Sequence, residues 1–362
     1  MANPLCEYFG VCGGCTAQHI DYQQQLENKN KALARAINYN SIEVFSANEY
    51  RYRNKLELLF IPNGLGLRKK DKPSQIVEIE KCVIAEDEIN NLITEMRNFF
   101  KNTDIKTFRY AVVRKSGNET AISFVLRNSS TKLTEATEQI TEFAKKTSAN
   151  NVIITYNNPD TDESASDDFF VVKGSDMLKE KYLSKEFCYS VQGFFQNNHR
   201  VAEKMQEHVN QLLKKHETKE NTLLDLYAGV GTFGIINADL FKEVFVVENF
   251  KQSIDAANKN IENNRIKNAK AFVLDAKQIG RLKLPKGLFI IADPPRSGME
   301  QKAIDKIKEL QPEVLIYISC NMEKLSKDIK KFKDYEIKSV AMFDMFPQTP
   351  HIEAIAELVK KN

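Results

Sequence analysis

The feature that most constrains the fold is a regular alternation, in the second half of the chain, of short apolar runs with longer amphipathic stretches. Five runs have the length and composition of buried strands, at residues 222–227, 243–249, 270–276, 287–293 and 313–319. Helical patterns such as residues 253–264 separate them. Because parallel strands need crossover helices, this alternation predicts a doubly wound, Rossmann-like α/β domain with a mostly parallel sheet.

Two more apolar runs, residues 339–347 and 351–360, follow that alternation. They predict two further strands, which we expect to form an antiparallel hairpin at the edge of the sheet.

The first half of the chain has a different pattern. Residues 50–79 show the alternation and turn residues of a β meander, and further strand-like runs extend to residue 157 around a polar helix near 135–146. This half predicts a smaller α+β domain in front of the α/β domain. We expect three parts: residues 1–90 and 91–185, which form the first domain, and residues 186–362, which form the second.

Composition excludes some classes of protein. The 362 residues allow two or three domains, and the 52 Lys and Arg against 49 Asp and Glu do not by themselves indicate a nucleic-acid partner. No apolar run approaches the about 18 residues of a membrane span, and the first ten residues do not resemble a signal peptide. We therefore expect a cytoplasmic protein without membrane contact.

The turn after the first predicted strand contains Gly229 and Gly231, which let a backbone approach a ligand closely. Glu248 ends the second strand, where a carboxylate accepts hydrogen bonds from ribose hydroxyls, although a solvated strand end is the alternative. Asp275 ends the third strand and is placed to reach an adenine or to cap a helix. Since Gly234 comes one residue too late for a pyrophosphate fingerprint, S-adenosylmethionine (SAM) fits better than NAD.

Reactive side chains follow the fourth and fifth strands. Asp293 begins an Asp-Pro-Pro-Arg-Ser-Gly segment, and Cys320 follows the fifth strand. Both loops should adjoin a ligand bound beyond the carboxyl ends of the strands, where a thiol can act as a nucleophile. Glu353, before the last strand, is the best carboxylate for proton removal. A plain turn at Asp293, an inert buried thiol and an exposed acid are the alternatives.

Three of the six cysteines, Cys6, Cys12 and Cys15, lie within ten residues, and Cys82 follows the meander. Four thiolates suit a [4Fe-4S] cluster or a structural zinc ion, and spacing alone slightly favours zinc on base rates. We expect the group to pin the amino-terminal loop to the meander.

Basic and aromatic residues gather on the meander. Cations bind phosphates and aromatic rings stack on bases, so the group predicts an RNA-binding surface, with a solvated charged face as the alternative. Its members are Tyr50, Arg51, Tyr52, Arg53, Lys55, Arg68, Lys69, Lys70 and Lys72.

Motifs along essentially the whole chain resemble those of the RNA 5-methyluridine methyltransferase family. They are the cysteine set, Gly-Phe-Phe-Gln-Asn-Asn at 193–198, Asp-Leu-Tyr-Ala-Gly-Val-Gly-Thr at 225–232, Asp-Pro-Pro-Arg-Ser-Gly at 293–298, Tyr-Ile-Ser-Cys-Asn at 317–321 and residues 343–353. The resemblance implies a class I SAM-dependent methyltransferase domain behind an RNA-binding domain, with an iron-sulfur cluster at the four cysteines.

The resemblance also implies residue roles. Cys320 adds to C6 of a uracil, C5 takes the methyl group, and Glu353 removes the C5 proton. The residues implied to surround SAM are Gln196, Tyr227, Thr232, Glu248, Asp275 and Asp293. Thr232 stands where many members carry Asn, and its hydroxyl can still form a hydrogen bond.

The chain begins at the cysteine set, without the small β-barrel domain of many members, and so it is most similar to the short form that acts on 23S rRNA. We expect a monomer acting on 23S rRNA, with tRNA as the alternative substrate. Two other functions remain open: an amino-group methyltransferase, which needs no thiol, and a noncatalytic RNA-binding or ribosome-assembly factor.

Overall fold

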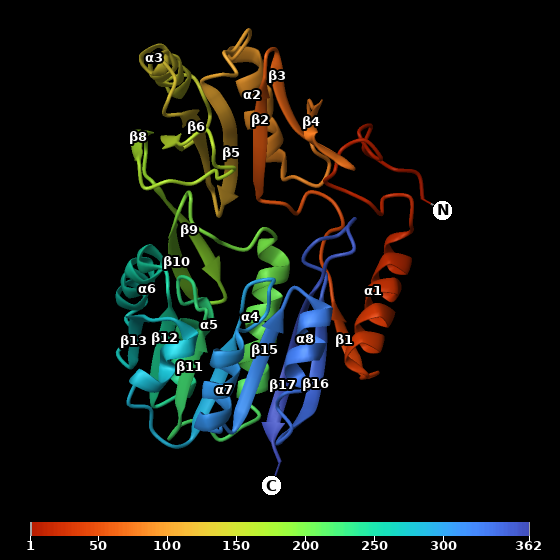
Figure 1. The fold of residues 1–362 in the computed structure, drawn as a ribbon, viewed down its shortest axis with the longest axis vertical. Helices are drawn as coiled ribbons and strands as arrows, with labels where there is room; N and C mark the ends of the chain where they lie inside the picture. The colour runs from red at the N-terminus through yellow and green to blue at the C-terminus, as the bar shows by residue number, and fades with distance from the viewer. Residues whose placement is uncertain (1, 362) are drawn as a thin grey trace.

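The structure, a computed structural model, describes residues 2–361 and confirms the α/β sheet that the second half predicts (Figure 1). The sheet has eight strands in the order β1-β16-β17-β15-β14-β11-β12-β13. Its strands are β1 (Ile42–Phe45), β11 (Thr222–Leu226), β12 (Glu243–Glu248), β13 (Ala269–Val273), β14 (Leu288–Ala292), β15 (Val314–Ser319), β16 (Tyr335–Phe343) and β17 (Glu353–Lys360).

The strand order reverses direction at β11. From there β12 and β13 extend one way and β14 and β15 the other, and all four pairings are parallel. In such sheets ligands bind beyond the carboxyl ends of the strands where the order reverses. The loops after β11 and β14 therefore mark the expected ligand position.

The last two strands pair antiparallel, as predicted, but not at the edge. β17 lies between β15 and β16 and pairs antiparallel with both. The edge is formed by β1, which pairs in parallel with β16. A four-residue, half-exposed strand gives too short a pattern for its sheet to be read from the sequence.

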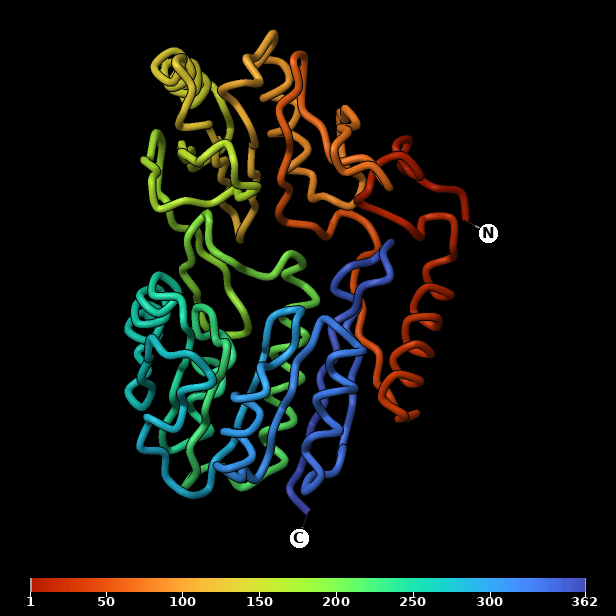
Figure 2. The backbone as a smooth tube through the Cα atoms, viewed as in Figure 1, coloured from red at the N-terminus to blue at the C-terminus, as the bar shows by residue number. Residues whose placement is uncertain are grey.

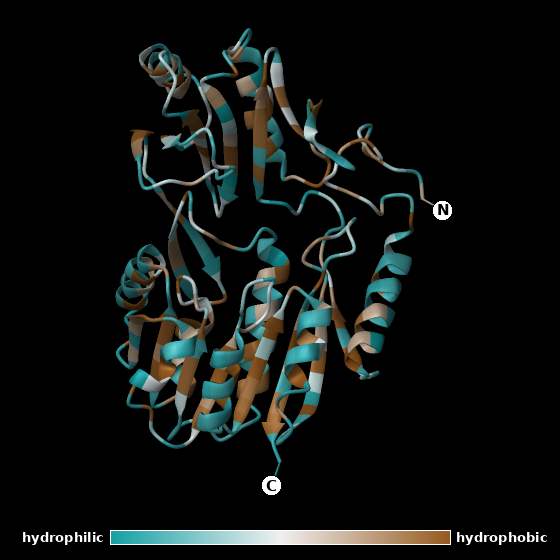
Figure 3. Cartoon of the chain, viewed as in Figure 1, coloured by the Kyte–Doolittle hydropathy of each residue, from teal (hydrophilic) through white to brown (hydrophobic). Residues whose placement is uncertain are grey.

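Helices cover both faces of this sheet. One face packs against α4 (His199–Leu213), α5 (Thr232–Ile236) and α6 (Lys251–Asn263), and the other against α1 (Tyr22–Ile37), α7 (Gln301–Leu310) and α8 (Met322–Ile329). Short 3₁₀ turns at Ala238–Leu240 and Ala276–Arg281 complete the connections. Figure 3 shows apolar strands between helices whose outer surfaces are polar.

Residues 1–90 do not form one part, in contrast to the expected division. The apolar side of α1, with Leu26 and Leu33, packs in the core of the eight-stranded sheet, and β1 belongs to that sheet. From residue 55 onward the same segment contributes three strands to a second sheet. Figure 2 shows the amino-terminal helix beside the carboxy-terminal strands.

The second sheet has seven strands in the order β4-β3-β2-β5-β6-β7-β8, and α2 and α3 share its core. Its elements are β2 (Lys55–Ile61), β3 (Gly64–Lys69), β4 (Lys72–Glu78), α2 (Asp87–Phe99), β5 (Phe108–Ser116), β6 (Glu119–Arg127), α3 (Leu133–Ala144), β7 (Asn151–Asn157) and β8 (Phe169–Lys173). A hairpin of β9 (Met177–Tyr182) and β10 (Lys185–Ser190) links the two units and crosses the expected boundary at 185. Among residues 2–361, no helix combines the length and apolar character needed to cross a membrane.

Candidate active site

The glycine turn after β11 and the end of β12 meet in the structure. Gly229 and Gly231 have φ of 54° and 84°, a left-handed conformation that glycine adopts without strain. Glu248 accepts a hydrogen bond from the Gly229 backbone N–H at 3.2 Å through Oε2, and from the N–H groups of Asn249 and Phe250 through Oε1. The two features predicted to share a ligand therefore lie together.

Gly234 has a packing role that explains its position. A Cβ at this residue would lie 3.0 Å from Asp225 Oδ2, which accepts a hydrogen bond from the Gly234 N–H at 2.7 Å. Asp225 is buried, and burial raises the pKa of its carboxyl to about 8, with Asp293 and Glu248 adding to the shift. The second oxygen of Asp225 has no hydrogen-bond partner within the described chain.

Other predicted cofactor residues lie at the same end of the sheet. Tyr227, just after β11, has φ of 58°. Thr232 is the first residue of α5, and its hydroxyl accepts a hydrogen bond from Gln206 at 3.1 Å. Asp275 caps the following 3₁₀ turn through the Lys277 N–H at 3.0 Å, which is the alternative that the sequence left open. A cofactor contact by Asp275 stays a prediction.

Gln196 lies on the loop between β10 and α4. Asn54, just before β2, donates its side-chain N–H to the Gln196 carbonyl at 3.1 Å and its backbone N–H to the Asn197 carbonyl at 3.0 Å. Asn54 is 5% exposed and so joins the two sheets at this loop. Sequence analysis missed this residue; its only signal is a polar residue at the start of an otherwise apolar strand face.

Strand register brings Cys320 and Glu353 to the same end of the sheet. Ser319 pairs with Ala354 as the last pair of the antiparallel β15–β17 ladder, so Cys320 follows one partner and Glu353 precedes the other. The Glu353 carboxylate also contributes to the raised pKa of Cys320. Glu353 also pairs with Phe343 of β16 and is 7% exposed. Asp293 follows β14, the strand on the other side of β15. Three ionisable groups that were predicted separately from the sequence therefore lie at the same end of the sheet, beyond the carboxyl ends of β14 and β15.

The surroundings at this end of the sheet favour the protonated forms of Cys320, Asp293 and Glu353. Burial, together with the carboxylates of Glu353 and Asp293, raises the pKa of Cys320 to about 11, while Arg296 opposes the shift. Burial alone raises the pKa of Asp293 to about 7. Burial and then Asp293 raise the pKa of Glu353 well above its usual value. A positively charged ligand would lower all three pKa values, because it stabilises the anions.

All four predicted metal-ligating cysteines line one cavity of about 680 Å³, together with basic and aromatic side chains. As the side chains stand, no group of three or more His, Cys, Asp and Glu residues within 2–361 is arranged to hold a metal ion. The expected cluster therefore stays a prediction. The thiols are near enough for Cys82, Cys6 and Cys12 to raise the pKa of Cys15, which burial and these neighbours bring to about 12.

The predicted RNA-binding surface is only partly as expected. Arg53, Lys55, Arg68, Lys69 and Lys70 line the cysteine cavity. Tyr52 is 2% exposed and donates its hydroxyl hydrogen to the Pro347 carbonyl at 2.9 Å, so the expectation that it stacks on a base is wrong. Arg68 is paired with Asp162 at 2.8 Å. Lys69, Lys70 and Lys72 form no ion pair with any residue in the described range.

The chain resembles known proteins over almost its whole length. The family model described as tRNA (uracil-5-)-methyltransferase matches residues 21–361. A protein named as an RNA methyltransferase of Caldanaerobacter subterraneus subsp. tengcongensis is 31% identical, over 98% of this chain and 84% of its own length. The tRNA (uracil(54)-C(5))-methyltransferase of Pyrococcus abyssi is 30% identical, over 98% and 86%.

The likeness extends to three dimensions. The crystal structure of the Pyrococcus abyssi tRNA (uracil-54, C5)-methyltransferase, in complex with S-adenosyl-L-homocysteine, superposes with a TM-score of 0.79 at 27% identity. The match covers 97% of this chain and 86% of that one. Both units of the fold therefore have a counterpart in one solved structure.

Proposed function

Because the chain belongs to the tRNA (uracil-5-)-methyltransferase family, we propose that it transfers a methyl group from SAM to C5 of a uridine in RNA, by covalent catalysis at Cys320. The observation that carries the proposal is the β15–β17 register, which ends with Ser319 paired to Ala354 and so brings Cys320 and Glu353 close together. A nucleophile and a proton acceptor at the ends of adjacent strands can act on neighbouring atoms of one ring.

The chemistry needs both groups. Uracil C5 is a weak nucleophile until the Cys320 thiolate adds to C6, which places an electron pair on C5 as an enolate. SAM, when bound, supplies an electrophilic methyl group to that carbon. The Glu353 carboxylate then takes the C5 proton, and the electrons of the C5–H bond expel the thiolate from C6. Base and thiol are both regenerated when Glu353 gives up the proton.

The glycine turn, Glu248 and Asp293 are proposed to hold SAM. Glu248, at the end of β12, would accept hydrogen bonds from ribose hydroxyls, and Gly229 would let the backbone approach. Gln196, Tyr227, Thr232 and Asp275 complete the proposed set. The positive charge of the sulfonium group would offset the negative charge of the carboxylates at this end of the sheet.

We propose a [4Fe-4S] cluster at the four cysteines, with zinc as the alternative. The donor set fits, because Gly14 donates its N–H to Cys12 Sγ at 3.4 Å, and backbone N–H groups near Cys6 and Cys82 oppose the rise of the pKa of these thiols. Gln18 Nε2 is buried without an oxygen acceptor and lies beside Cys15. Thiols with raised pKa values become ligands only where a metal centre replaces their protons.

The proposed RNA substrate is a 23S rRNA hairpin, on the resemblance to the short form, and tRNA is the second candidate. The tRNA candidate is favoured by the relatives with an assigned uridine, which are named as enzymes of tRNA uracil 54. In either RNA the target base must leave its stack to reach Cys320. We also propose that the protein acts as a monomer in the cytoplasm, where these RNAs meet it.

The test is incubation of the purified protein with labelled SAM and total RNA that lacks 5-methyluridine, followed by size separation and mapping of the label. Label at uridine C5 in 23S rRNA or in tRNA supports the proposal and identifies the substrate. Label on an exocyclic amine, retained in a Cys320→Ser protein, would support an amino-group methyltransferase. RNA binding without SAM binding would support a noncatalytic factor.

A further inference from the structure

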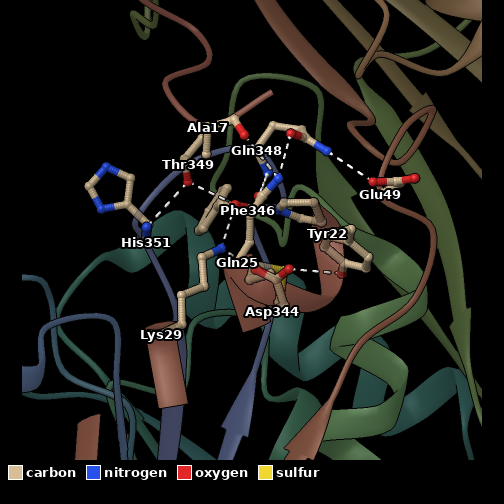
Figure 4. A network of polar contacts seen from close by, with 12 residues as sticks. Ala17, Tyr22, Gln25, Lys29, Glu49, Asp344, Phe346, Gln348, Thr349 and His351 are labelled. Carbon is tan, nitrogen blue, oxygen red and sulfur yellow. Dashed lines mark hydrogen bonds and ion pairs between the residues drawn. The ribbon is translucent and has the colours of Figure 1, made fainter. Parts of the chain in front are cut away.

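The segment that leads into Glu353 is held by the opposite end of the chain. Residues 344–352, here called the β16–β17 connection, rise above the sheet edge toward the amino-terminal loop (Figure 2). Figure 4 shows side chains of α1 reaching this connection from below. The amino-terminal loop of residues 2–21, here called the cysteine loop, meets it from above at Ala17. These contacts join residues more than 300 positions apart.

The first contact is a buried ion pair. Lys29 Nζ lies 2.5 Å from Asp344 Oδ1, and neither side chain is more than 6% exposed. Tyr22 donates its hydroxyl hydrogen to the other Asp344 oxygen at 2.8 Å, and Lys29 also donates to the Phe346 carbonyl at 3.2 Å. A buried ion pair contributes little net stability compared with apolar residues of the same volume. Its effect is to fix the position of the connection.

The second contact is a reciprocal amide pair between Gln25 and Gln348. Gln25 donates to Gln348 Oε1 at 2.9 Å and accepts from the Gln348 backbone N–H at 3.1 Å. The Gln348 carbonyl accepts from the N–H groups of Thr16 and Ala17, at 2.9 and 3.1 Å, just after Cys15. The backbone of Gln348 has φ of 67°, a left-handed conformation that is strained for a residue other than glycine. We infer that these hydrogen bonds hold the backbone in that conformation.

Short steps connect this pair to Glu353. The Thr349 hydroxyl donates to the Phe346 carbonyl at 2.8 Å and accepts from the His351 N–H at 3.2 Å. Ile352 is buried, and Glu353 follows as the first residue of β17. Each residue from 344 to 349 therefore either contacts α1 or the cysteine loop or is next to a residue that does.

We propose that Gln25, Lys29 and Gln348 are positioning residues that keep the Glu353 carboxylate close to Cys320. This inference rests on the proposed function. It gives α1 a role in the reaction: the helix acts through the connection, without touching the uridine. It also gives the cysteine loop a mechanical link to the proton acceptor through Thr16 and Ala17.

The step that would suffer is removal of the C5 proton, because that is the step Glu353 performs. Addition of Cys320 and methyl transfer precede it. A displaced Glu353 should therefore leave methylated RNA attached to Cys320, and the protein–RNA conjugate should survive denaturation. A merely structural role for α1 would lower the amount of folded protein without causing this conjugate to accumulate.

The decisive variant is Gln25→Leu, with Gln24→Leu as its matched control. Gln24 is the exposed neighbour on α1, and its side chain donates hydrogen bonds to Glu27 and Asn28. Lys29 is a poorer choice, because its removal leaves the Asp344 charge buried and unpaired. In single-turnover reactions at saturating SAM, Gln25→Leu should release 5-methyluridine RNA about 10- to 100-fold more slowly. The conjugate on ordinary uridine RNA should rise several-fold, while Gln24→Leu matches the unaltered protein.

A second variant covers misfolding. Tyr22→Phe removes only the hydroxyl that binds Asp344 and should show the same two changes at smaller size. If folded Gln25→Leu and Tyr22→Phe proteins release product at the unaltered rate without conjugate, the inference is wrong. If the unaltered protein itself makes no 5-methyluridine and no conjugate with 5-fluorouridine RNA, the proposed function fails instead.

Discussion

The end of the sheet that carries Cys320 and the cavity lined by Cys6, Cys12, Cys15 and Cys82 differ in how their side chains are held. Cys320, Glu353 and Asp293 follow or begin strands of one sheet, so backbone register sets their relative positions. Cys6, Cys12 and Cys15 lie on a loop, and Cys82 follows β4 in another sheet. The first site is assembled by the fold itself, whereas the second joins separate pieces of chain and gains most from a bound group.

The sharpest way to test this difference is to remove the nucleophile alone. Cys320→Ala should lower the rate of 5-methyluridine formation by on the order of 10⁴-fold or more, because no other side chain can make the C6 bond. Its thermal unfolding should change little, since the thiol is only half-buried. The measurement is label transfer from SAM, together with conjugate formation on 5-fluorouridine RNA. Cys188→Ala is the control and should keep full activity.

Removing one cysteine of the cavity should affect both regions. Cys15→Ser should abolish bound iron and sulfide and slow methylation by about 10- to 100-fold, because the loop that contacts Gln348 loses its anchor. Metal analysis and label transfer measure the two effects. Zinc in the unaltered protein would replace the iron-sulfur proposal by its alternative. Full activity in a metal-free Cys15→Ser protein would show that the two regions are independent.

Much of the fold was predictable because its signals are local. The strands between 222 and 319 are short, mostly apolar runs, and the candidate site residues Glu248, Asp293 and Cys320 end or follow such runs. The position of β17 was not local. A sheet with β16 beside β15 would have separated Glu353 from Cys320, whereas the pairing of β17 with β15 brings them together. Strand order depends on packing that no short window of sequence contains.

The amino-terminal helix shows the same limit. Its many Gln, Asn and Lys residues predict a surface helix, yet Gln25 and Lys29 are buried. They recur four residues apart on the side that also carries Leu33, which is a weak sign of a buried polar stripe. Their partners, Gln348 and Asp344, are more than 300 residues away, so the reason for burial appears only in three dimensions.

The raised pKa values of Cys320 and Glu353 predict that methylation activity rises with pH. A thiol whose pKa is raised to about 11 is mostly protonated near pH 7, and its thiolate fraction grows about tenfold per pH unit below that value. Glu353, whose pKa is also raised, must lose a proton as well. The value of kcat/KM for RNA should therefore increase from pH 6 to 9, and a flat profile would contradict it.

The cause of that rise can be tested at one carboxylate. Asp293→Asn removes a negative charge that raises the pKa of Cys320, so this thiol should be alkylated at lower pH. Alkylation rates followed peptide by peptide with mass spectrometry give the pKa of each cysteine. Cys188 provides the internal control: burial raises its pKa too, but Asp293 is not among the causes. Equal shifts at both cysteines would indicate a general loosening of the fold.

The smallest expected effect concerns the lysines beside the cysteine cavity. Lys69, Lys70 and Lys72 lie on β3, the β3–β4 turn and β4, and Lys70 and Lys72 are exposed. If Lys70 binds a phosphate, Lys70→Ala should weaken RNA binding a few-fold and reduce the slope of log affinity against log salt by about one. Lys308→Ala, an exposed change on α7, should leave both unchanged. An unaltered salt slope in Lys70→Ala would show that Lys70 does not bind a phosphate.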